Sequence, residues 1–463
     1  AQHGAKVIVL EKGGNIAAAR EASARSTPRW SPTMSEDVPT LLNHANQTQA
    51  GDANMLLYKT WAEKSGEMIE WMKETLEPKG MLFPFEWHKP DDPHAYYPAM
   101  CYNPCMGEYN PDGPNYGAYA HLEVMNEVLG ELGGEVMFMT PAKMLVQDES
   151  GKVCGVIAES KDKGVIQINA KNGVIVCTGG YGANDEMLQD LCPGNSNWCV
   201  LRDSVTEEGD GIRMALWAGA ELEAGGACMI WNRGIMFDDT EFDGSYQGGD
   251  IFLPGSQPFL HVNANGERYG AEMPFEPMLT NARMNTPGNV AWSIFDSDYE
   301  TYIMQQQPER YDRFTDGLDA VMEKWLGNGK LIKADTLDDL AKQLDIPADT
   351  FKATVERYNS MAEAGEDVDF DVPAQWLAPV KTAPFYATKI TGATFLTVCG
   401  GLRTDENMQV CDENDTPIEG LYNTGIMTGD FYANTYNFVM PGQNLGAVCG
   451  TLSYLLGRDL AAL

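Results

Sequence analysis

Residues 420–457 read GLYNTGIMTGDFYANTYNFVMPGQNLGAVCGTLSYLLG. A short apolar run breaks at Gly425 and Gly429, passes through an aromatic loop to Pro441 and Gly442, and continues in a helix-like apolar pattern. The backbone N–H groups of a glycine turn and the positive end of a helix dipole both attract an anion or an electron-accepting ring. The stretch therefore predicts a binding turn, although many strand-to-helix glycine turns bind nothing.

Two further stretches have the same character. Residues 173–184, GVIVCTGGYGAN, form an apolar strand that ends in a double glycine, which lets the backbone approach a cofactor closely. Residues 6–10 form another apolar strand, followed by Glu11 and a glycine turn. In a dinucleotide-binding βαβ unit, the second strand ends in an acidic residue that binds the ribose, after a first strand and a GxGxxG turn. Only the second strand of such a unit and its acidic residue are present in the sequence.

Composition excludes several classes of function. The chain has 463 residues, and 32 basic against 67 acidic residues give a formal net charge of -35, which repels phosphate backbones and anionic membranes. We expect no nucleic-acid partner. No apolar run approaches the roughly 20 residues that span a bilayer, so the sequence predicts a soluble chain, cytoplasmic or exported to the cell envelope. The ten cysteines are irregularly spaced, and the close pair Cys101 and Cys105 lacks the second pair of a metal site.

Predicted helices and strands follow one another along the chain, and their pattern changes at about residue 236. The sequence predicts a mainly helical segment at residues 16–81, with an amphipathic helix at 55–76, and further helices at 120–132 and 209–220. Strands are predicted at 135–142, 143–147 and 166–170, with a hairpin turn at Ser150 and Gly151. Residues 236–383 contain polar helices, an acidic helical hairpin at about 337–363, and no parallel-strand pattern. The simplest architecture is an α/β body interrupted by a mixed insertion.

Four segments resemble the FAD-dependent reductases and dehydrogenases typified by soluble fumarate reductase and 3-ketosteroid dehydrogenase. They are KVIVLEKGG, NGVIVCTGGYGANDEM, NANGERYGAE, and GGLRTD with GLYNTG. The resemblance implies an α/β, Rossmann-like FAD-binding domain at residues 1–235 and 384–463, interrupted by an α+β capping domain at residues 236–383. The family's first strand and GxGxxG turn should precede Ala1, so we expect an N-terminally incomplete sequence. The alternative is a protein that has lost this cofactor contact.

The resemblance also implies which residues contact FAD. Attachment is expected to be non-covalent, because relatives that bond FAD through histidine carry it after the second strand, and no histidine lies between Glu11 and Asn43. The expected FAD contacts are Glu11, Lys12, Gly13, Ala142, Thr178, Gly179, Gly180, Gly425, Gly429, Asp430, Gln443, Asn444 and Leu445.

The fumarate-specific residues of the family are missing. The positions that carry the proton relay, the proton-donor arginine and the clamp histidine fall on Phe252, Gly255, Glu276 and Thr397. A dicarboxylate would therefore enter an uncompensated pocket, at a cost of several kcal/mol per buried charge.

The loop NTYNFVMPG instead resembles that of ketosteroid dehydrogenases, with Tyr436 and Gly442 at the positions that polarise a substrate carbonyl. These two donors would form an oxyanion hole worth about 3 kcal/mol each. The other interpretation of Tyr436 is a buried ring with a satisfied hydroxyl.

Two residues are candidates to move the proton. Tyr119 lies roughly where ketosteroid dehydrogenases have a helix-start tyrosine, and Arg283 lies about two helical turns past the fumarate-type donor position. Alternatively, Tyr119 only packs, and Arg283 pairs with Glu272 or Glu276.

The expected function is an FAD-dependent oxidoreductase acting on CH–CH bonds. It would reduce a small electron-poor alkene conjugated to a carbonyl (an enone, acrylate or unsaturated lactone). Anaerobic bacteria use relatives of this type in anaerobic respiration, to transfer electrons to small organic acceptors. The electron donor, a protein or a reduced carrier, is not identified by the sequence. One alternative is 3-ketosteroid-type dehydrogenation in the oxidative direction. An alternative of another class is a catalytically inactive, flavoprotein-like binding protein.

Overall fold

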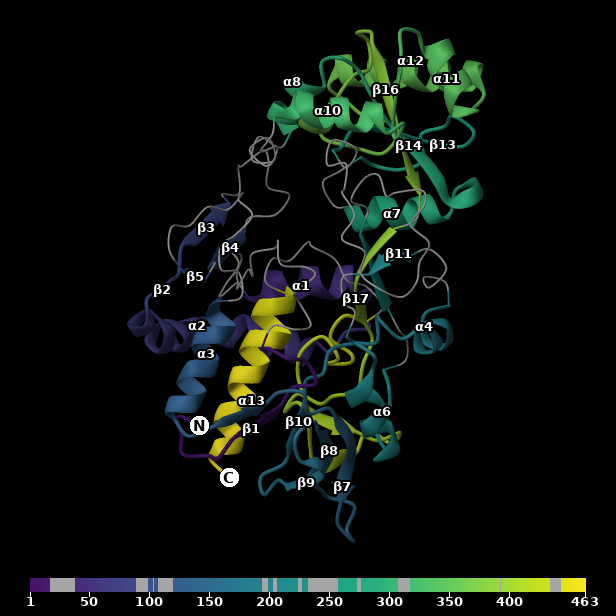
Figure 1. The fold of residues 1–463 in the computed structure, drawn as a ribbon. Helices are drawn as coiled ribbons and strands as arrows, with labels where there is room; N and C mark the ends of the chain where they lie inside the picture. Colours follow the sequence, from purple (N-terminus) through teal and green to yellow (C-terminus); the bar gives the residue numbers. More distant parts are fainter. Residues whose placement is uncertain are drawn as a thin grey trace. The chain divides into compact units, whose positions relative to one another are not determined.

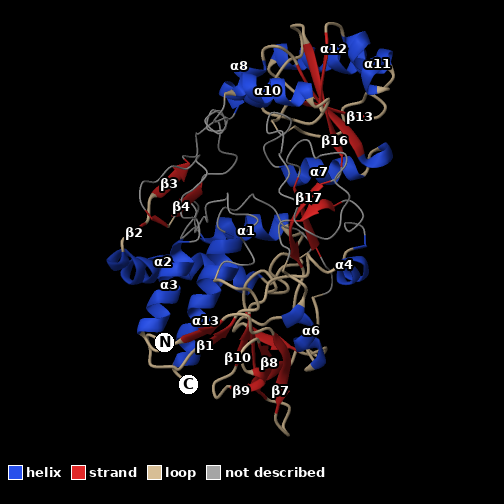
Figure 2. Ribbon diagram, viewed as in Figure 1, coloured by secondary structure: helices blue, strands red, loops and turns tan. Residues whose placement is uncertain are grey.

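The structure is a computed structural model that describes residues 1–16, 38–88, 99–102, 104–106, 120–193, 199–202, 206–223, 227–231, 257–272, 276–306, 317–391, 393–433 and 443–463. Its helices and strands are shown in Figures 1 and 2. Two compact units can be distinguished by their internal contacts. Unit 1 comprises Ala1–Ser196, Asp203–Met229 and Thr397–Leu463, and unit 2 comprises Asn197–Arg202 and Ile230–Leu396.

Unit 1 contains parallel strand pairs that join distant parts of the sequence. Strand β1 (Ile8–Leu10) pairs in parallel with β6 (Glu135–Met137). Strand β10 (Val174–Val176) pairs in parallel with β19 (Pro417–Asn423), which is antiparallel to β18 (Gln409–Cys411). Glycine turns follow the carboxyl ends of β10 and β19, and parallel pairing brings those two ends together at one edge.

The remaining strands are mostly antiparallel. Strands β7 (Ala142–Gln147), β8 (Val153–Ser160) and β9 (Gly164–Asn169) form a three-stranded meander. Two small antiparallel sheets pair β2 (Met81–Leu82) with β5 (Cys105–Met106) and β3 (Phe85–His88) with β4 (Ala99–Tyr102). In a further sheet, β17 (Ala393–Cys399) lies between β11 (Cys199–Arg202), with which it pairs in parallel, and β12 (Ala227–Trp231).

Helices complete the described part of unit 1. They are α1 (Val38–Thr48), α2 (Met55–Leu76), α3 (Ala120–Glu131), α4 (Asp185–Leu191), α6 (Asp210–Trp217), the π-helix η6 (Gln443–Thr451) and α13 (Leu452–Ala461). The side chain of Asn54 caps α2 by accepting a hydrogen bond from the Leu56 N–H at 3.1 Å. The apolar face of α2 buries Tyr58 and Trp61 in one core with Val448 and Leu452.

Unit 2 is built on one antiparallel sheet. Its order is β13 (Leu260–Asn263), β14 (Val290–Phe295), β16 (Phe385–Thr391) and β15 (Leu331–Ala334). Helices α11 (Leu337–Leu344) and α12 (Ala348–Ala364) share a core with Leu260, Ile294 and Ala387 on one face of this sheet. Phe295 and Tyr386 on the opposite face pack with residues of α8 (Tyr299–Gln306) and α10 (Leu318–Gly327). Helix α7 (Glu276–Met284) precedes β14.

Most element predictions agree with the structure, and the differences have local causes. Helix α2 covers the predicted residues 55–76, and α11 with α12 form the predicted helical hairpin. The strand predicted at 135–142 ends at Met137, because Met139 adopts a left-handed backbone with φ of 49°. Among the described residues, no helix has both the length and the apolar character needed to cross a membrane.

Candidate active site

Glu11 lies at the end of β1, as predicted, and its side chain shapes the following turn. Its Oε1 accepts a hydrogen bond from the Gly13 N–H at 2.6 Å. Its backbone N–H donates to Met137 at 3.0 Å, and its carbonyl accepts from the Thr140 N–H at 3.0 Å. Ala142 begins β7 two residues after Thr140, so the structure places these predicted cofactor residues on adjoining segments.

Lys12 is held by two carboxylates of unit 1. Its Nζ lies 2.9 Å from Glu208 Oε2 and 2.8 Å from Asp210 Oδ2. Burial lowers the pKa of Lys12, but these ion pairs more than offset burial and leave the pKa above its ordinary value. The ammonium group thus joins the β1 turn to the start of α6, and its predicted contact with FAD remains a prediction.

The double glycine after β10 is required by packing. Gly179 has φ of +76°, and a Cβ there would lie 2.7 Å from Glu207 Oε1. A Cβ on Gly180 would lie 2.5 Å from Val398 Cγ1. The neighbouring Thr178 accepts a hydrogen bond at Oγ1 from the Gly211 N–H at 3.0 Å. The three predicted residues Thr178, Gly179 and Gly180 are therefore closely packed against the segments that carry Glu207, Gly211 and Val398.

The turn after β19 continues the pairing of the two strand ends. The Thr424 N–H donates to Val176 at 3.2 Å, and the Gly425 N–H donates to Val448 in η6 at 3.0 Å. The buried amide of Asn423 donates to Thr404 Oγ1 and to the Met427 carbonyl, both at 2.9 Å. Asn423 thus holds the start of this turn in place through buried hydrogen bonds.

Two glycine segments lie against each other beside this turn. The Gly429 N–H donates to the Leu402 carbonyl at 2.8 Å. A Cβ on Gly401 would lie only 1.9 Å from the Met427 carbonyl oxygen, and a Cβ on Gly429 would lie 2.3 Å from Leu402. The segments GGLRTD and GLYNTGIMTGD are therefore in close backbone contact, which a side chain would prevent.

Asp430 is held by Glu223 and by the cap of α2. Its N–H donates to Glu223 Oε2, and its carbonyl accepts from the Asn54 N–H at 2.6 Å. Burial raises the pKa of Glu223 to about 8, and the negative charge of Asp430 adds to this increase. Arg403 Nη1, 3.8 Å from Asp430 Oδ1, supplies the compensating positive charge.

Gln443 begins η6 and is also buried. Its Nε2 donates to the hydroxyl of Tyr58 in α2, which accepts a second hydrogen bond from Gln49 Nε2 at 3.1 Å. The Tyr58 ring stacks on Phe431, with 4.3 Å between centroids and 6° between the planes. Asn444 and Leu445 follow in the first turn of η6. Helix α2 therefore supports both ends of the predicted flavin-facing segment.

The residues of these turns fit a polar cofactor such as FAD. At these turns, four buried side-chain atoms have no hydrogen-bond partner among the described residues: Glu223 Oε1, Asn423 Oδ1, Thr428 Oγ1 and Gln443 Oε1. Buried polar atoms are normally satisfied, so these indicate a polar occupant. Beside Gly425, with φ of +85°, a Cβ would meet no atom within 4 Å, which indicates open space at the turn.

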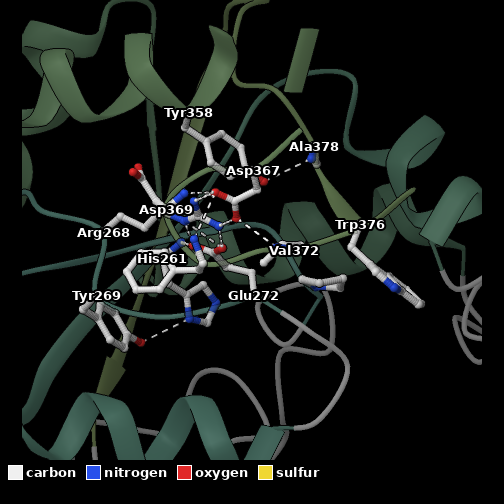
Figure 3. Close-up of polar contacts among 12 residues, drawn as sticks. His261, Arg268, Tyr269, Glu272, Tyr358, Asp367, Asp369, Val372, Trp376 and Ala378 are labelled. Atoms are coloured by element: carbon white, nitrogen blue, oxygen red, sulfur yellow. Dashed lines mark hydrogen bonds and ion pairs between the residues drawn. The ribbon is translucent and has the colours of Figure 1, made fainter. Parts of the chain in front are cut away.

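Unit 2 contains a buried ionic network around Arg268 (Figure 3). Its guanidinium binds Glu272 Oε2 at 2.5 Å and Asp367 Oδ2 at 2.7 Å, and it lies 5.1 Å from the Tyr358 ring centroid. Burial alone would lower the pKa of Arg268, but the hydrogen bonds to Asp367 and Glu272 raise it above its ordinary value. The network joins the loop after β13 to the segment after α12.

A second polar group in unit 2 contains the predicted catalytic residue Arg283. Arg283 lies in α7, is fully buried, and donates from Nε to Asn289 Oδ1 at 3.3 Å. Burial lowers the pKa of Arg283 to about 10. Burial and, second, the charge of Arg283 lower the pKa of His261 to about 3. Figure 3 shows His261 Nδ1 facing the Tyr269 hydroxyl, 3.3 Å away.

Three other predicted catalytic residues, Tyr119, Tyr436 and Gly442, lie outside the described residues, as do Phe252 and Gly255. Among the described residues, no group of three or more His, Cys, Asp or Glu side chains is arranged to hold a metal ion.

Sequence reasoning missed three residues that shape the turns of unit 1: Tyr58, Glu223 and Asn423. Asn423 stands inside the quoted segment GLYNTG, where a polar residue at the end of an apolar strand was an available signal. Tyr58 looked like an ordinary buried position of an amphipathic helix. Glu223 carries no local signal, because its role depends on Asp430, far away in the sequence.

Comparison with known proteins identifies the family. The family model described as "FAD binding domain" matches residues 1–437. The vinyl phenol reductase of Lactiplantibacillus plantarum is 25% identical over 468 residues, which cover 96% of this chain and 90% of that protein. The 3-oxosteroid 1-dehydrogenase of Mycolicibacterium smegmatis is 31% identical over 68% of this chain, and the match spans 57% of that protein.

A solved structure shows the same fold. The 3-ketosteroid delta1-dehydrogenase of Sterolibacterium denitrificans superposes with a TM-score of 0.75 at 21% identity, covering 99% of each chain. The match of fold, the family model and the glycine turns of unit 1 agree with one another. The chain belongs to the FAD binding domain family and is an FAD-dependent oxidoreductase.

Proposed function

We propose that the protein reduces a carbon–carbon double bond conjugated to a carbonyl group in a small molecule, such as an enone, acrylate or unsaturated lactone. The observation that carries the reduction of a carbon–carbon double bond is the similarity to a vinyl phenol reductase over nearly the whole of both chains. The conjugated carbonyl is proposed because Tyr436 and Gly442 are expected to act as oxyanion donors. Bound reduced FAD supplies a hydride for the β-carbon. The protein's own residues then have two tasks, which are to stabilise the enolate oxygen and to protonate the α-carbon.

We further propose that unit 2 acts as the capping domain expected at about residues 236–383, and that FAD binds non-covalently. The antiparallel sheet of unit 2, with helices on both faces, supports an α+β cap. FAD would be held by the turns around Glu11, Gly179 and Gly425, with Gln443, Asn444 and Leu445 at the start of η6.

Arg283 is the proposed proton donor. An ordinary guanidinium is a very weak acid, but burial lowers the pKa of Arg283 to about 10, which makes proton release easier. Glu272, one of the two carboxylates considered for pairing with Arg283, binds Arg268. Tyr119 is the competing donor, and Tyr436 with Gly442 remain the proposed oxyanion donors from the sequence.

The test is a rapid-mixing experiment on FAD-loaded protein reduced chemically under anaerobic conditions. The reduced protein is mixed with an enone, an acrylate, an unsaturated lactone and a vinyl phenol, and flavin reoxidation is followed by absorbance. We expect at least one of the three carbonyl-conjugated alkenes to reoxidise the flavin faster than buffer does. If none does, the proposal is rejected.

The second candidate is dehydrogenation of a 3-ketosteroid-type substrate, favoured by the 31% identity to a 3-oxosteroid 1-dehydrogenase. It is distinguished by mixing the oxidised protein with a saturated cyclic ketone. Flavin bleaching by the ketone, without reoxidation by enones, would select this direction.

A further inference from the structure

The start of η6 is tied to the N-terminal helices by three buried side chains. Nε2 of Gln443 donates a hydrogen bond to the hydroxyl of Tyr58, 385 positions earlier in α2. The same hydroxyl accepts a hydrogen bond at 3.1 Å from Nε2 of Gln49, the residue that follows α1. Each of the three residues is at most 3% exposed. We call Gln49, Tyr58 and Gln443 the amide triad.

The ring of Tyr58 gives the amide triad a fixed centre. It stacks on Phe431, with 4.3 Å between the ring centroids, and it meets Trp61 edge-on at 6.3 Å. Phe431 in turn meets Tyr432 at an angle of 75° between the ring planes. Aromatic rings that are packed on a face and on an edge in a dense core have little freedom to move. The Tyr58 hydroxyl is therefore held in one place, where it accepts the N–H groups of both amides.

The carbonyl oxygen of Gln443 is left as a buried acceptor. An amide side chain donates from Nε2 and accepts at Oε1, and Tyr58 uses the donor half. Within the described part of the chain, Oε1 of Gln443 has no hydrogen-bond partner, and neither has Oε1 of Gln49, whose donor half Tyr58 also uses. An unsatisfied buried acceptor is costly, so Gln443 Oε1 indicates an occupant that supplies an N–H or O–H group.

The backbone at Gln443 narrows the choice of occupant. Gln443 is the first residue of η6, and the first turn of a helix has backbone N–H groups that attract carbonyl oxygens or anions. The site therefore combines backbone donors with one side-chain acceptor. On a flavin ring, two carbonyl oxygens flank N3–H, which is the only N–H group of the oxidised ring. This edge is complementary to the site, whereas the ribityl chain offers hydroxyl groups alone.

We propose that Tyr58 is a positioning residue for FAD, because it turns the Gln443 amide so that Oε1 accepts a hydrogen bond from flavin N3–H. This inference rests on the placement of FAD given under the proposed function. Tyr58 acts through Gln443 and not by contact with the ring. Without the Tyr58 hydroxyl, the amide is free to turn over and present Nε2, a donor that cannot pair with N3–H.

The first test measures FAD affinity by titrating flavin-free protein and following flavin fluorescence. Tyr58→Phe keeps the ring that stacks on Phe431 but removes the hydroxyl, and Gln443→Met keeps the side-chain length but removes the amide. Each variant should bind FAD about two- to tenfold more weakly, the contribution of one net hydrogen bond. The double variant should bind FAD no more weakly than Gln443→Met, because Tyr58 acts through Gln443.

Tyr454→Phe is the matched control for the loss of a tyrosine hydroxyl in unit 1. The Tyr454 hydroxyl of α13 donates to Glu67 Oε1 of α2 at 3.0 Å, outside the amide triad. Its removal should leave FAD affinity unchanged. A control variant that weakens FAD binding as much as Tyr58→Phe would count against a special role of the amide triad.

The second test observes the contact itself, which a loss of packing alone would not change. FAD is labelled with ¹⁵N at N3, and the N3–H proton is followed by NMR on the protein at saturating FAD. A buried acceptor shifts this proton downfield and slows its exchange with solvent. Both effects should be lost in Gln443→Met and in Tyr58→Phe, and retained in Tyr454→Phe.

Two results would overturn the proposal. An N3–H proton with the same shift and exchange rate in the wild type and in Gln443→Met would mean that Oε1 has another partner. A change in Gln443→Met without a change in Tyr58→Phe would mean that Tyr58 does not orient the amide.

The alkene experiment separates this inference from the proposed function. If no alkene reoxidises the wild-type flavin while N3–H responds to both substitutions, the proposed function fails and the role of Tyr58 stands. If an alkene reoxidises the flavin while N3–H responds to neither substitution, the role of Tyr58 fails and the proposed function stands.

Discussion

The buried carboxylate of Glu223 accepts a hydrogen bond from the backbone N–H of Asp430, 207 positions later in the sequence. This contact ties the segment after α6 to the turn that carries Gly425 and Gly429. Because Glu223 is buried beside the carboxylate of Asp430, it links the geometry of the predicted flavin-facing turn to pH.

We expect Glu223→Gln to reduce the pH dependence of stability. Burial raises the pKa of Glu223 from 4.5 to about 8. A raised pKa in the folded state means that the stabilisation is fully present below pH 4.5 and is lost as pH rises through about 8. The hydrogen bond from the Asp430 N–H and the charge of Arg403 favour ionisation of Glu223, whereas the side chains of Asp430 and Cys192 oppose it.

The neutral glutamine should therefore be more stable than the wild type at pH 8, by up to about 4 kcal/mol. Melting temperatures of the flavin-free and FAD-loaded proteins between pH 5 and 9 provide the measurement. Parallel curves for wild type and variant would contradict this assignment.

Gly401→Ala should disrupt the contact between the two glycine segments. The new Cβ would lie 1.9 Å from the Met427 carbonyl oxygen, so the backbone must move. We expect a loss of about 2–4 kcal/mol in stability and a lower FAD content after purification. Gly130→Ala in α3 is the control, since its Cβ meets no atom within 4 Å and should stabilise by up to about 1 kcal/mol. Equal flavin content in the two variants would count against the close-packing argument.

Arg268→Met should destabilise unit 2 strongly. It removes the cation that compensates Glu272 and Asp367, whose side chains are 0% exposed, and breaking such a network costs about 3–5 kcal/mol. Arg357→Met is the control, because Arg357 pairs with Asp369 with its own side chain 59% exposed and should cost less than about 1 kcal/mol. Denaturant unfolding of both variants measures the difference, and similar costs would refute a stabilising role of the buried network.

Tyr436→Phe tests the proposed oxyanion hole. Loss of one donor to the developing enolate should slow flavin reoxidation by an alkene about 10²–10³-fold, while flavin content stays unchanged. Rapid-mixing absorbance gives both quantities. An unchanged rate would assign Tyr436 to packing.

Much of the local structure was predictable because it is encoded within short windows of sequence. The three- and four-residue spacing of apolar side chains predicted α2, and the glycines at 179, 180, 425 and 429 predicted turns that the structure contains. The family followed from the order of four short segments. The residues that hold these turns in place were harder to predict from the sequence, since Tyr58 and Glu223 have no distinctive neighbours in the sequence.

The sequence by itself determined the class of the protein, an FAD-dependent oxidoreductase, because strand-end and glycine-turn motifs are local and survive in order along the chain. Only the tertiary structure decided that Glu223 meets Asp430, that Tyr58 meets Gln443, and that His261, Ser293 and Thr388 lie opposite one another in the sheet of unit 2. These contacts depend on strand order and register, and a shift of one residue in register would turn each side chain to the opposite face of its sheet.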